Sequence, residues 1–355
     1  MSNEQPHGHS TSGLSPGVEK PPSMNPADAL THARRRPSVT TLVKAIERAD
    51  RAALSKAITL IESTKAADRD FAERILDHLP KKDGLSIGIT GAPGVGKSTL
   101  IEAFGIHLLQ RGHRVAVLAI DPSSIRTKGS ILGDKTRMPQ LATDSRAYVR
   151  PTPTGRASGG VAESTRSTIR ICEAAGFDIV LVETTGVGQS EFDVYSMVDV
   201  FLLLINAHAG DELQGIKRGI MELADAVVVT KADGDQLAAA RRASSTYRRA
   251  LSLSASRESG WKPPVLICSG RSGDGIADLW NTVESFIAQG LPGRSLEHER
   301  GARADIVREV ERLLGAQFVG RPLVKRDLDR LQTKVAGGDT TPRAAARALL
   351  DAHGA

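Results

Sequence analysis

The sequence predicts an α/β fold with a mostly parallel central sheet that is covered by helices on both faces. Short, β-branched apolar runs alternate with helical patterns through the middle of the chain. Strands that are buried on both faces of a parallel sheet have this continuous apolar character. We expect strands at Leu85–Thr90, Val115–Ile120, Ile179–Glu183, Val200–Asn206, Ala226–Thr230 and Val265–Ser269.

Helical patterns flank these strands. Apolar residues recur at helical spacing from Thr41 to about Leu79, which predicts two or three amphipathic helices. After Gly290 the helical pattern returns without strand signals, and its apolar stripe needs the core or a second subunit to cover it. We therefore expect a disordered leader (1–38), a helical extension (39–82), an α/β domain (83–290) and a C-terminal helical arm (291–355). The leader is polar and too poor in apolar residues to offset the entropy of ordering.

Composition excludes several classes of protein. The 355 residues include only two cysteines, Cys172 and Cys268, so a disulfide framework is not expected and a reducing compartment is. No apolar run approaches the roughly 20 residues that cross a bilayer, and acids in the leader disfavour a mitochondrial transit peptide, so we expect a cytoplasmic protein without a membrane partner. The 47 basic residues are interspersed with 41 acidic ones and aromatic content is 3%, so nucleic acid is not an expected partner either.

A glycine-rich motif follows the first predicted strand. Gly91-x-x-x-x-Gly96-Lys97-Ser98 leads into a helical pattern at Thr99–Leu109, which is the context of a P-loop. Its backbone N–H groups can surround a phosphate, Lys97 can bridge the β- and γ-phosphates, and the Ser98 hydroxyl can bind Mg²⁺. The expected nucleotide contacts here are Gly91, Ala92, Pro93, Gly94, Val95, Gly96, Lys97, Ser98 and Thr99. The motif predicts a P-loop NTPase fold.

Two acidic residues close strands where such a protein binds its metal. Asp121 follows one predicted strand and Glu183 ends another, so both are expected near Mg²⁺ and the γ-phosphate. Glu183-Thr184-Thr185-Gly186 can place the Gly186 amide against the γ-phosphate. Val187 stands where Ras-like proteins have the glutamine that orients the attacking water. We therefore expect slow intrinsic hydrolysis that a partner or another loop accelerates.

The predicted strand Ala226–Thr230 leads into Thr230-Lys231-Ala232-Asp233, which is close to the Asn-Lys-x-Asp pattern that selects guanine. Asp233 can accept from guanine N1–H and the 2-amino group, whereas adenine would leave the carboxylate unpaired. The Lys231 stem can lie along the ring face, and Thr230 offers a hydroxyl to the base or to the P-loop. Ser269-Gly270 stands where a backbone N–H can reach guanine O6. The expected ligands are GTP and GDP with Mg²⁺.

Longer motifs closely resemble the MeaB/ArgK family of GTPases, which belong to the class that includes signal-recognition and nickel-insertion proteins. The match runs from about Thr41 to the C-terminus. The motifs are the P-loop, Ile120-Asp121-Pro122-Ser123-Ser124, Gly133-Asp134-Lys135-Thr136-Arg137-Met138, Glu183-Thr184-Thr185-Gly186-Val187-Gly188-Gln189-Ser190-Glu191 and Asp211-Glu212-Leu213-Gln214-Gly215-Ile216-Lys217.

The resemblance implies roles that composition and spacing do not give. It implies that Asp121, Asp134 and Glu183 form the acidic group around Mg²⁺ and the attacking water. It also implies that Asp211–Lys217 is a switch loop in which Lys217 supplies transition-state charge, although a solvated loop remains an equal alternative. The C-terminal helices resemble the homodimerisation arm of the family, and the implied partner is an adenosylcobalamin-dependent acyl-CoA mutase, typically methylmalonyl-CoA mutase.

The leading hypothesis is a GTP-hydrolysing chaperone that assists loading and protection of the mutase cofactor. An ATP-dependent kinase or transport ATPase is the first alternative, and Asp233 argues against it because an adenine site needs no such carboxylate. A nickel or cobalt metallochaperone GTPase is the second alternative. It would require a Cys-x-x-Cys motif or a His-rich tract, whereas His7 and His9 are isolated.

Overall fold

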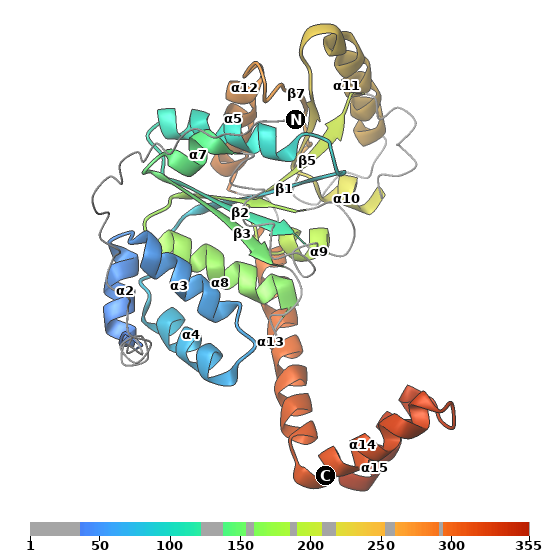
Figure 1. Cartoon of the computed structure of the whole chain (residues 1–355). Coiled ribbons are helices and arrows are strands. Elements are labelled where there is room, and N and C mark those ends of the chain that lie inside the picture. The colour runs from blue at the N-terminus through green and yellow to red at the C-terminus, as the bar shows by residue number, and fades with distance from the viewer. Residues whose placement is uncertain are drawn as a thin grey trace, which may run out of the picture. The chain divides into compact units, whose positions relative to one another are not determined.

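The computed structural model describes residues 36–121, 138–153, 160–184, 190–207, 218–252, 260–290 and 294–354. Internal contacts separate Met1–Ser38 from Val39–Ala355, and the elements below belong to the second unit. Its centre is a seven-stranded sheet in the order β3-β2-β4-β1-β5-β6-β7, in which all pairings are parallel (Figure 1). The strands are β1 (Leu85–Gly91), β2 (Val115–Asp121), β3 (Ala147–Pro153), β4 (Ile179–Glu183), β5 (Val200–Asn206), β6 (Ala226–Thr230) and β7 (Val265–Ile267).

Six of these strands confirm the sequence prediction, and β3 was not predicted. Its sequence Ala-Tyr-Val-Arg-Pro-Thr-Pro contains Pro151 and Pro153, which cannot donate backbone hydrogen bonds. Among the described residues this strand pairs only with β2, so it lies at the edge of the sheet, where proline is tolerated. The last strand is shorter than expected and ends at Ile267 rather than Ser269.

Helices cover both faces of the sheet, as predicted. Alternate side chains of β2 enter different clusters: Val115 and Val117 join one, and Leu118 and Ile120 join the other. This is the period-two pattern of a strand that is buried on both faces. One face is covered by α5 (Lys97–Gln110), α7 (Pro139–Thr143) and α12 (Ile276–Ala288); the other by α8 (Gly160–Ala174), α9 (Ser190–Tyr195), α10 (Arg218–Leu223) and α11 (Leu237–Ser252), with the short 3-10 helix η3 (Gly234–Gln236) leading into α11.

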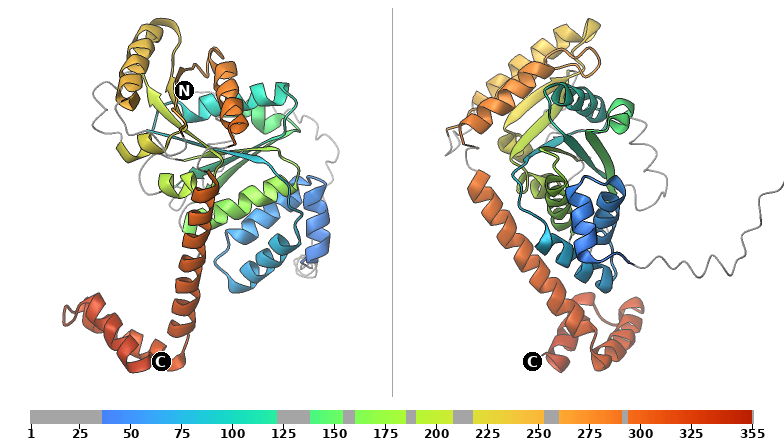
Figure 2. Two further views of the ribbon diagram at one scale, coloured as in Figure 1. Left: turned by 180° about the vertical axis from the view of Figure 1, so that it is seen from behind. Right: turned by 90° about the vertical axis from the view of Figure 1, so that its left-hand side faces the viewer.

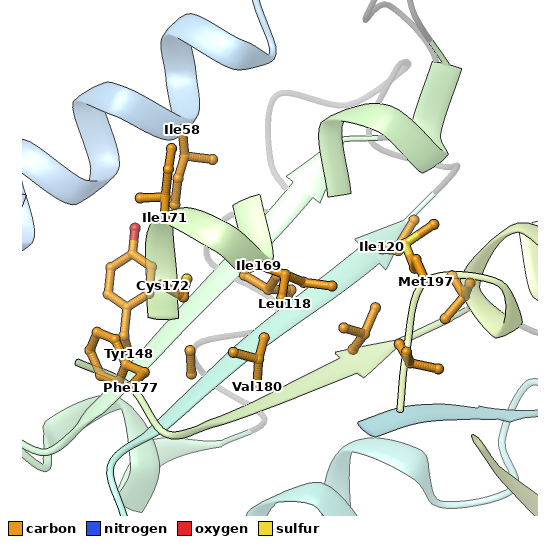
Figure 3. Packing of buried hydrophobic residues seen from close by; sticks show 14 of the residues in the cluster. Ile58, Leu118, Ile120, Tyr148, Ile169, Ile171, Cys172, Phe177, Val180 and Met197 are labelled. Carbon is orange, nitrogen blue, oxygen red and sulfur yellow. The ribbon is translucent and has the colours of Figure 1, made fainter. Parts of the chain in front are cut away.

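Three N-terminal helices pack against α8 and so form a further layer on that face. They are α2 (Val39–Glu47), α3 (Arg51–Ile61) and α4 (Ala66–His78), in agreement with the predicted two or three helices. The Asp50 carboxylate begins α3 by accepting hydrogen bonds from the first backbone N–H groups. Ile58 of α3 lies beside Ile171 of α8 in the buried cluster (Figure 3). These helices therefore belong to the core that supports the sheet.

The C-terminal helices are α13 (Arg294–Val319), α14 (Pro322–Ala336) and α15 (Pro342–His353). Two arginines connect α13 to the sheet domain: Arg166 of α8 donates to Asp305, and Arg308 pairs with Asp193 of α9 at 3.9 Å. The helices α14 and α15 pack against each other (Figure 2). Large apolar side chains that remain exposed on the described part of α13 are Ile306, Val307, Val310, Leu313, Leu314 and Val319.

In the part of the chain that the structure describes, no helix is both long and apolar enough to cross a bilayer.

Candidate nucleotide-binding site

The candidate site lies at the carboxyl ends of the central strands. The strand β1 lies between β4 and β5, and it leads into α5 on one face of the sheet. The helices that follow β4 and β5 along the chain, α9 and α10, cover the opposite face. Ligands of open α/β sheets bind where the connections diverge in this way.

The loop Gly91–Ser98 has the backbone that a phosphate site requires. Gly94 and Gly96 have φ angles of 77° and 103°, in the left-handed region that favours glycine. A Cβ at Gly91 would lie 2.5 Å from the carbonyl oxygen of Leu204, so the loop approaches β5 too closely for a side chain. Gly96 immediately precedes the first residue of α5. The loop therefore leads to a helix N-terminus, where backbone N–H groups and the helix dipole favour an anion.

Lys97 is the first residue of α5, and its side chain is directed back toward the loop. Its ammonium donates hydrogen bonds to the carbonyl oxygens of Gly91 at 2.7 Å and Ala92 at 3.1 Å. The residue is only 9% exposed, and a buried cation requires such acceptors. The positive charge is consequently held beside the curve of the loop that the sequence predicts to bind phosphate.

Two of the four predicted metal ligands lie together. The Ser98 hydroxyl donates to Glu183 Oε1 at 3.2 Å, because Ile89 and Glu183 are in register on β1 and β4. Next to them, the Thr184 hydroxyl donates to Thr90 Oγ1 at 2.8 Å and joins the ends of the same strands.

The remaining acidic and switch residues are only partly described. The backbone of Asp121 ends β2 next to β4, but its side chain lies outside the described residues, as do Asp134, Gly186 and Lys217. Within the described residues there is no group of three His, Cys, Asp or Glu that could hold a metal. A hydroxyl and a carboxylate nevertheless fit Mg²⁺, which prefers oxygen ligands and takes few of them from the protein when phosphates supply others.

The predicted base-binding carboxylate is held by a neighbouring hydroxyl. Ser269 Oγ donates to Asp233 Oδ2 at 2.5 Å, and it accepts from the backbone N–H groups of Arg271 and Ser272 at 3.2 and 3.1 Å. Ser269 is fully buried. This network orients the carboxylate. Oδ2 keeps a second lone pair, so both carboxylate oxygens can accept hydrogen bonds from a ligand.

The structure also distinguishes between the two amides predicted to reach guanine O6. The N–H of Ser269 donates to the carbonyl oxygen of Asp274 at 2.9 Å, so it is already paired. Gly270 lies on the wall of the cavity, and its amide is the better placed of the two. A Cβ at Gly270 would lie 2.7 Å from the Thr99 carbonyl oxygen, so the loop can approach α5 this closely only with a residue that has no side chain.

Thr230 faces the phosphate loop. Its hydroxyl donates to the carbonyl oxygen of Val95 at 2.6 Å and lies 3.1 Å from that of Ile205. Of the two partners that the sequence left open for this hydroxyl, the base and the P-loop, the structure shows the P-loop. The next residue, Lys231, has a φ of 56°, a conformation that costs a non-glycine residue about 1–3 kcal/mol and is concentrated at functional sites.

These groups border a cavity of about 420 Å³, within the range of small-molecule sites. The cavity joins the loop to the predicted base residues, and its lining is Gly96, Thr99, Leu100, Asn206, Thr230, Lys231, Asp233, Gln236, Gly270 and Arg271. Sequence reasoning missed Asn206, Gln236 and Arg271. A polar residue at the end of an apolar strand was a usable signal for Asn206. Gln236 ends the short helix η3 and Arg271 lies on the loop after β7, and the position of both depends on the fold.

A parallel sheet with a glycine-rich loop between β1 and α5 defines a P-loop nucleotide-binding protein. Sequence comparison gives the particular family: the model of the methylmalonyl-CoA mutase-associated GTPase MeaB matches residues 54–319, and the chain belongs to this family of GTPases.

Individual relatives agree with the family assignment. A probable GTPase of Mycobacterium bovis is 49% identical over 320 residues, which cover 88% of this chain and 95% of that protein. The mitochondrial methylmalonic aciduria type A homolog of Mus musculus is 43% identical over 88% of this chain and 79% of its own length. A crystal structure titled LAO/AO transport system kinase is 32% identical, covers 88% of this chain and 96% of that one, and has a TM-score of 0.66. The fold and the family predicted from the sequence are thus confirmed.

Proposed function

We propose that this GTPase selects guanine nucleotides and couples their hydrolysis to cofactor loading and protection in an adenosylcobalamin-dependent acyl-CoA mutase. The observation that carries the nucleotide assignment is the Asp233 carboxylate, oriented by Ser269 in a cavity that continues from the P-loop. A carboxylate in this position pairs with the two adjacent donors of guanine, and no such pair exists on adenine.

The phosphate end supplies the groups for hydrolysis. Lys97 bridges the β- and γ-phosphates after exchanging the loop carbonyls for phosphate oxygens. Ser98 and Glu183, together with Asp121 and Asp134, would hold Mg²⁺ directly or through water, and the Gly186 amide would bind the γ-phosphate. Because Val187 cannot orient water, turnover is slow until Lys217 or a partner supplies the missing charge.

The partner and the dimer rest on separate observations. The family description names methylmalonyl-CoA mutase, and we extend that association to this chain. The exposed apolar side chains of α13, such as Ile306 at 65% and Leu314 at 60%, would be covered in a homodimer formed through the C-terminal arm.

A kinase remains the second candidate because one similar structure carries that title. In a kinase that uses ATP, Asp233 would face adenine, which lacks the adjacent N1–H and 2-amino donors of guanine, and this disfavours the alternative.

The proposal is tested by GTP and ATP turnover of the full chain, with and without methylmalonyl-CoA mutase. We expect a preference for GTP and a faster rate with the mutase. A preference for ATP would refute the nucleotide assignment, and an unchanged rate would refute activation by that mutase. Lys97→Ala should abolish tight GTP binding, and normal GTP hydrolysis by this variant would refute the phosphate-site assignment.

A further inference from the structure

Asn206, the last residue of β5, brings an amide to the base cavity. Its Oδ1 atom is buried and has no hydrogen-bond partner within the described part of the chain. The residue lines the cavity together with Thr230, Lys231 and Asp233. A buried amide oxygen without a partner is costly, which points to a function for the group.

The sheet register places Asn206 beside the residue that departs from the guanine pattern. Asn206 and Thr230 are direct partners on the parallel strands β5 and β6, so their side chains lie on the same face of the sheet. The single hydroxyl proton of Thr230 is directed to the Val95 carbonyl at 2.6 Å. Thr230 therefore has no donor left for the base. The neighbouring Asn206 has an amide with both an NH₂ donor and an oxygen acceptor.

Guanine presents two acceptors on its major-groove edge, O6 and N7, and only O6 has a donor among the residues named above. Asp233 accounts for N1–H and the 2-amino group, and the Gly270 amide for O6. N7 is the acceptor next to O6 on the major-groove edge of guanine, and an asparagine amide is a suitable donor to a purine N7.

We propose that Asn206 is a nucleotide-binding residue whose Nδ2 donates a hydrogen bond to guanine N7. A half-turn of the side-chain amide exchanges Nδ2 with Oδ1, so either atom can be presented to the base. When Nδ2 faces the base, Oδ1 of Asn206 needs a donor of its own. Lys231 lines the same cavity and carries an ammonium group that can serve as this donor; its stem lies within 3.9 Å of where a Cβ on Gly96 would be. This inference rests on the proposed guanine specificity and adds to it a residue outside the expected motifs.

The test compares GDP with 7-deaza-GDP, in which a C–H replaces N7, by calorimetric titration of the full-length chain. We expect the wild type to bind 7-deaza-GDP about three- to tenfold more weakly than GDP, the effect of one net hydrogen bond. Asn206→Ala should weaken GDP by the same factor and bind both nucleotides equally. Asn206→Asp should bind GDP no better than Asn206→Ala, because a carboxylate cannot donate to N7. Asn281→Ala, which removes the same amide from an exposed position on α12, is the matched control and should behave as the wild type.

Three results would overturn the assignment of Asn206. These are an Asn206→Ala variant with unchanged GDP affinity, equal weakening of GDP and 7-deaza-GDP by that variant, or wild-type affinity of Asn206→Asp for GDP. Circular dichroism and thermal unfolding of each variant show whether it is folded. Failure of the proposed function is distinguishable, because the wild type would then bind ADP as tightly as GDP.

Discussion

Replacement of Ser269 by alanine tests whether this hydroxyl orients the base-binding carboxylate. The hydroxyl donates to Asp233 and accepts from the backbone N–H groups of Arg271 and Ser272, and the residue is fully buried. Loss of a hydrogen bond to a charged group, with two amides left unpaired, should lower the free energy of unfolding by about 1–3 kcal/mol.

The effect of Ser269→Ala on binding should be smaller than its effect on stability. The Ser269–Asp233 bond is present before nucleotide binds, so binding loses only the pre-orientation of Asp233. Fixing one side chain costs about 0.5–1.5 kcal/mol, which corresponds to GDP affinity about two- to tenfold weaker.

Two measurements on the full chain check these values: urea unfolding without nucleotide and calorimetric titration with GDP. Ser285→Ala removes a hydroxyl from the exposed side of α12 and should change neither quantity. Because Ser269 acts through Asp233, Ser269→Ala should have no further effect on GDP binding in an Asp233→Ala background. An equal loss of affinity in that background would refute the reasoning.

Three further predictions concern the metal site, the core and a buried acid. Glu183→Gln should lower Mg²⁺-dependent GTP hydrolysis by at least about 100-fold, while GDP binding in EDTA should stay unchanged; near-normal turnover would remove Glu183 from the site. Phe104→Ala should lower the free energy of unfolding, measured in urea titrations, by about 3–5 kcal/mol. Phe192→Ala, at a 49% exposed position, should change it little, and equal effects of the two substitutions would contradict the burial of Phe104 in the core. Burial, reinforced by Asp199, raises the pKa of Glu173 from 4.5 to about 7. The folded protein thus binds this proton more tightly than the unfolded chain, so the free energy of unfolding falls as pH rises from 4.5 to about 7. Glu173→Gln should raise the unfolding temperature at pH 8 but change it little at pH 5, and an equal change at both pH values would refute this reasoning. Glu47→Gln, at an exposed position, is the control.

The sheet was predictable from sequence to the extent that its strands are apolar. Five of the six predicted strands match within about one residue, because buried parallel strands have a distinctive composition. Composition gave no sign of β3, where Pro151, Pro153 and Arg150 hide a strand whose pairing depends on its place at the sheet edge.

The candidate site divides in a similar way. Lys97, Ser98 and Asp233 stand in motifs of fixed spacing, so the sequence located them. The hydrogen bond from Ser269 to Asp233 and the register of Asn206 beside Thr230 join residues that are distant in sequence. Contacts of this kind depend on the finished sheet and could not be read from local patterns.

The ion pairs at α13 have a thermodynamic consequence for nucleotide binding. Arg308 joins α13 to Asp193 of α9, and α9 follows Glu183 in the chain by only a few residues. If a bound nucleotide displaces α9, it changes the free energy with which α13 is held. Linkage is reciprocal, so whatever fixes α13, including a second subunit, must then change nucleotide affinity by the same factor. The affinity between subunits would then depend on whether nucleotide is bound, and nucleotide affinity would depend on whether the subunits are associated.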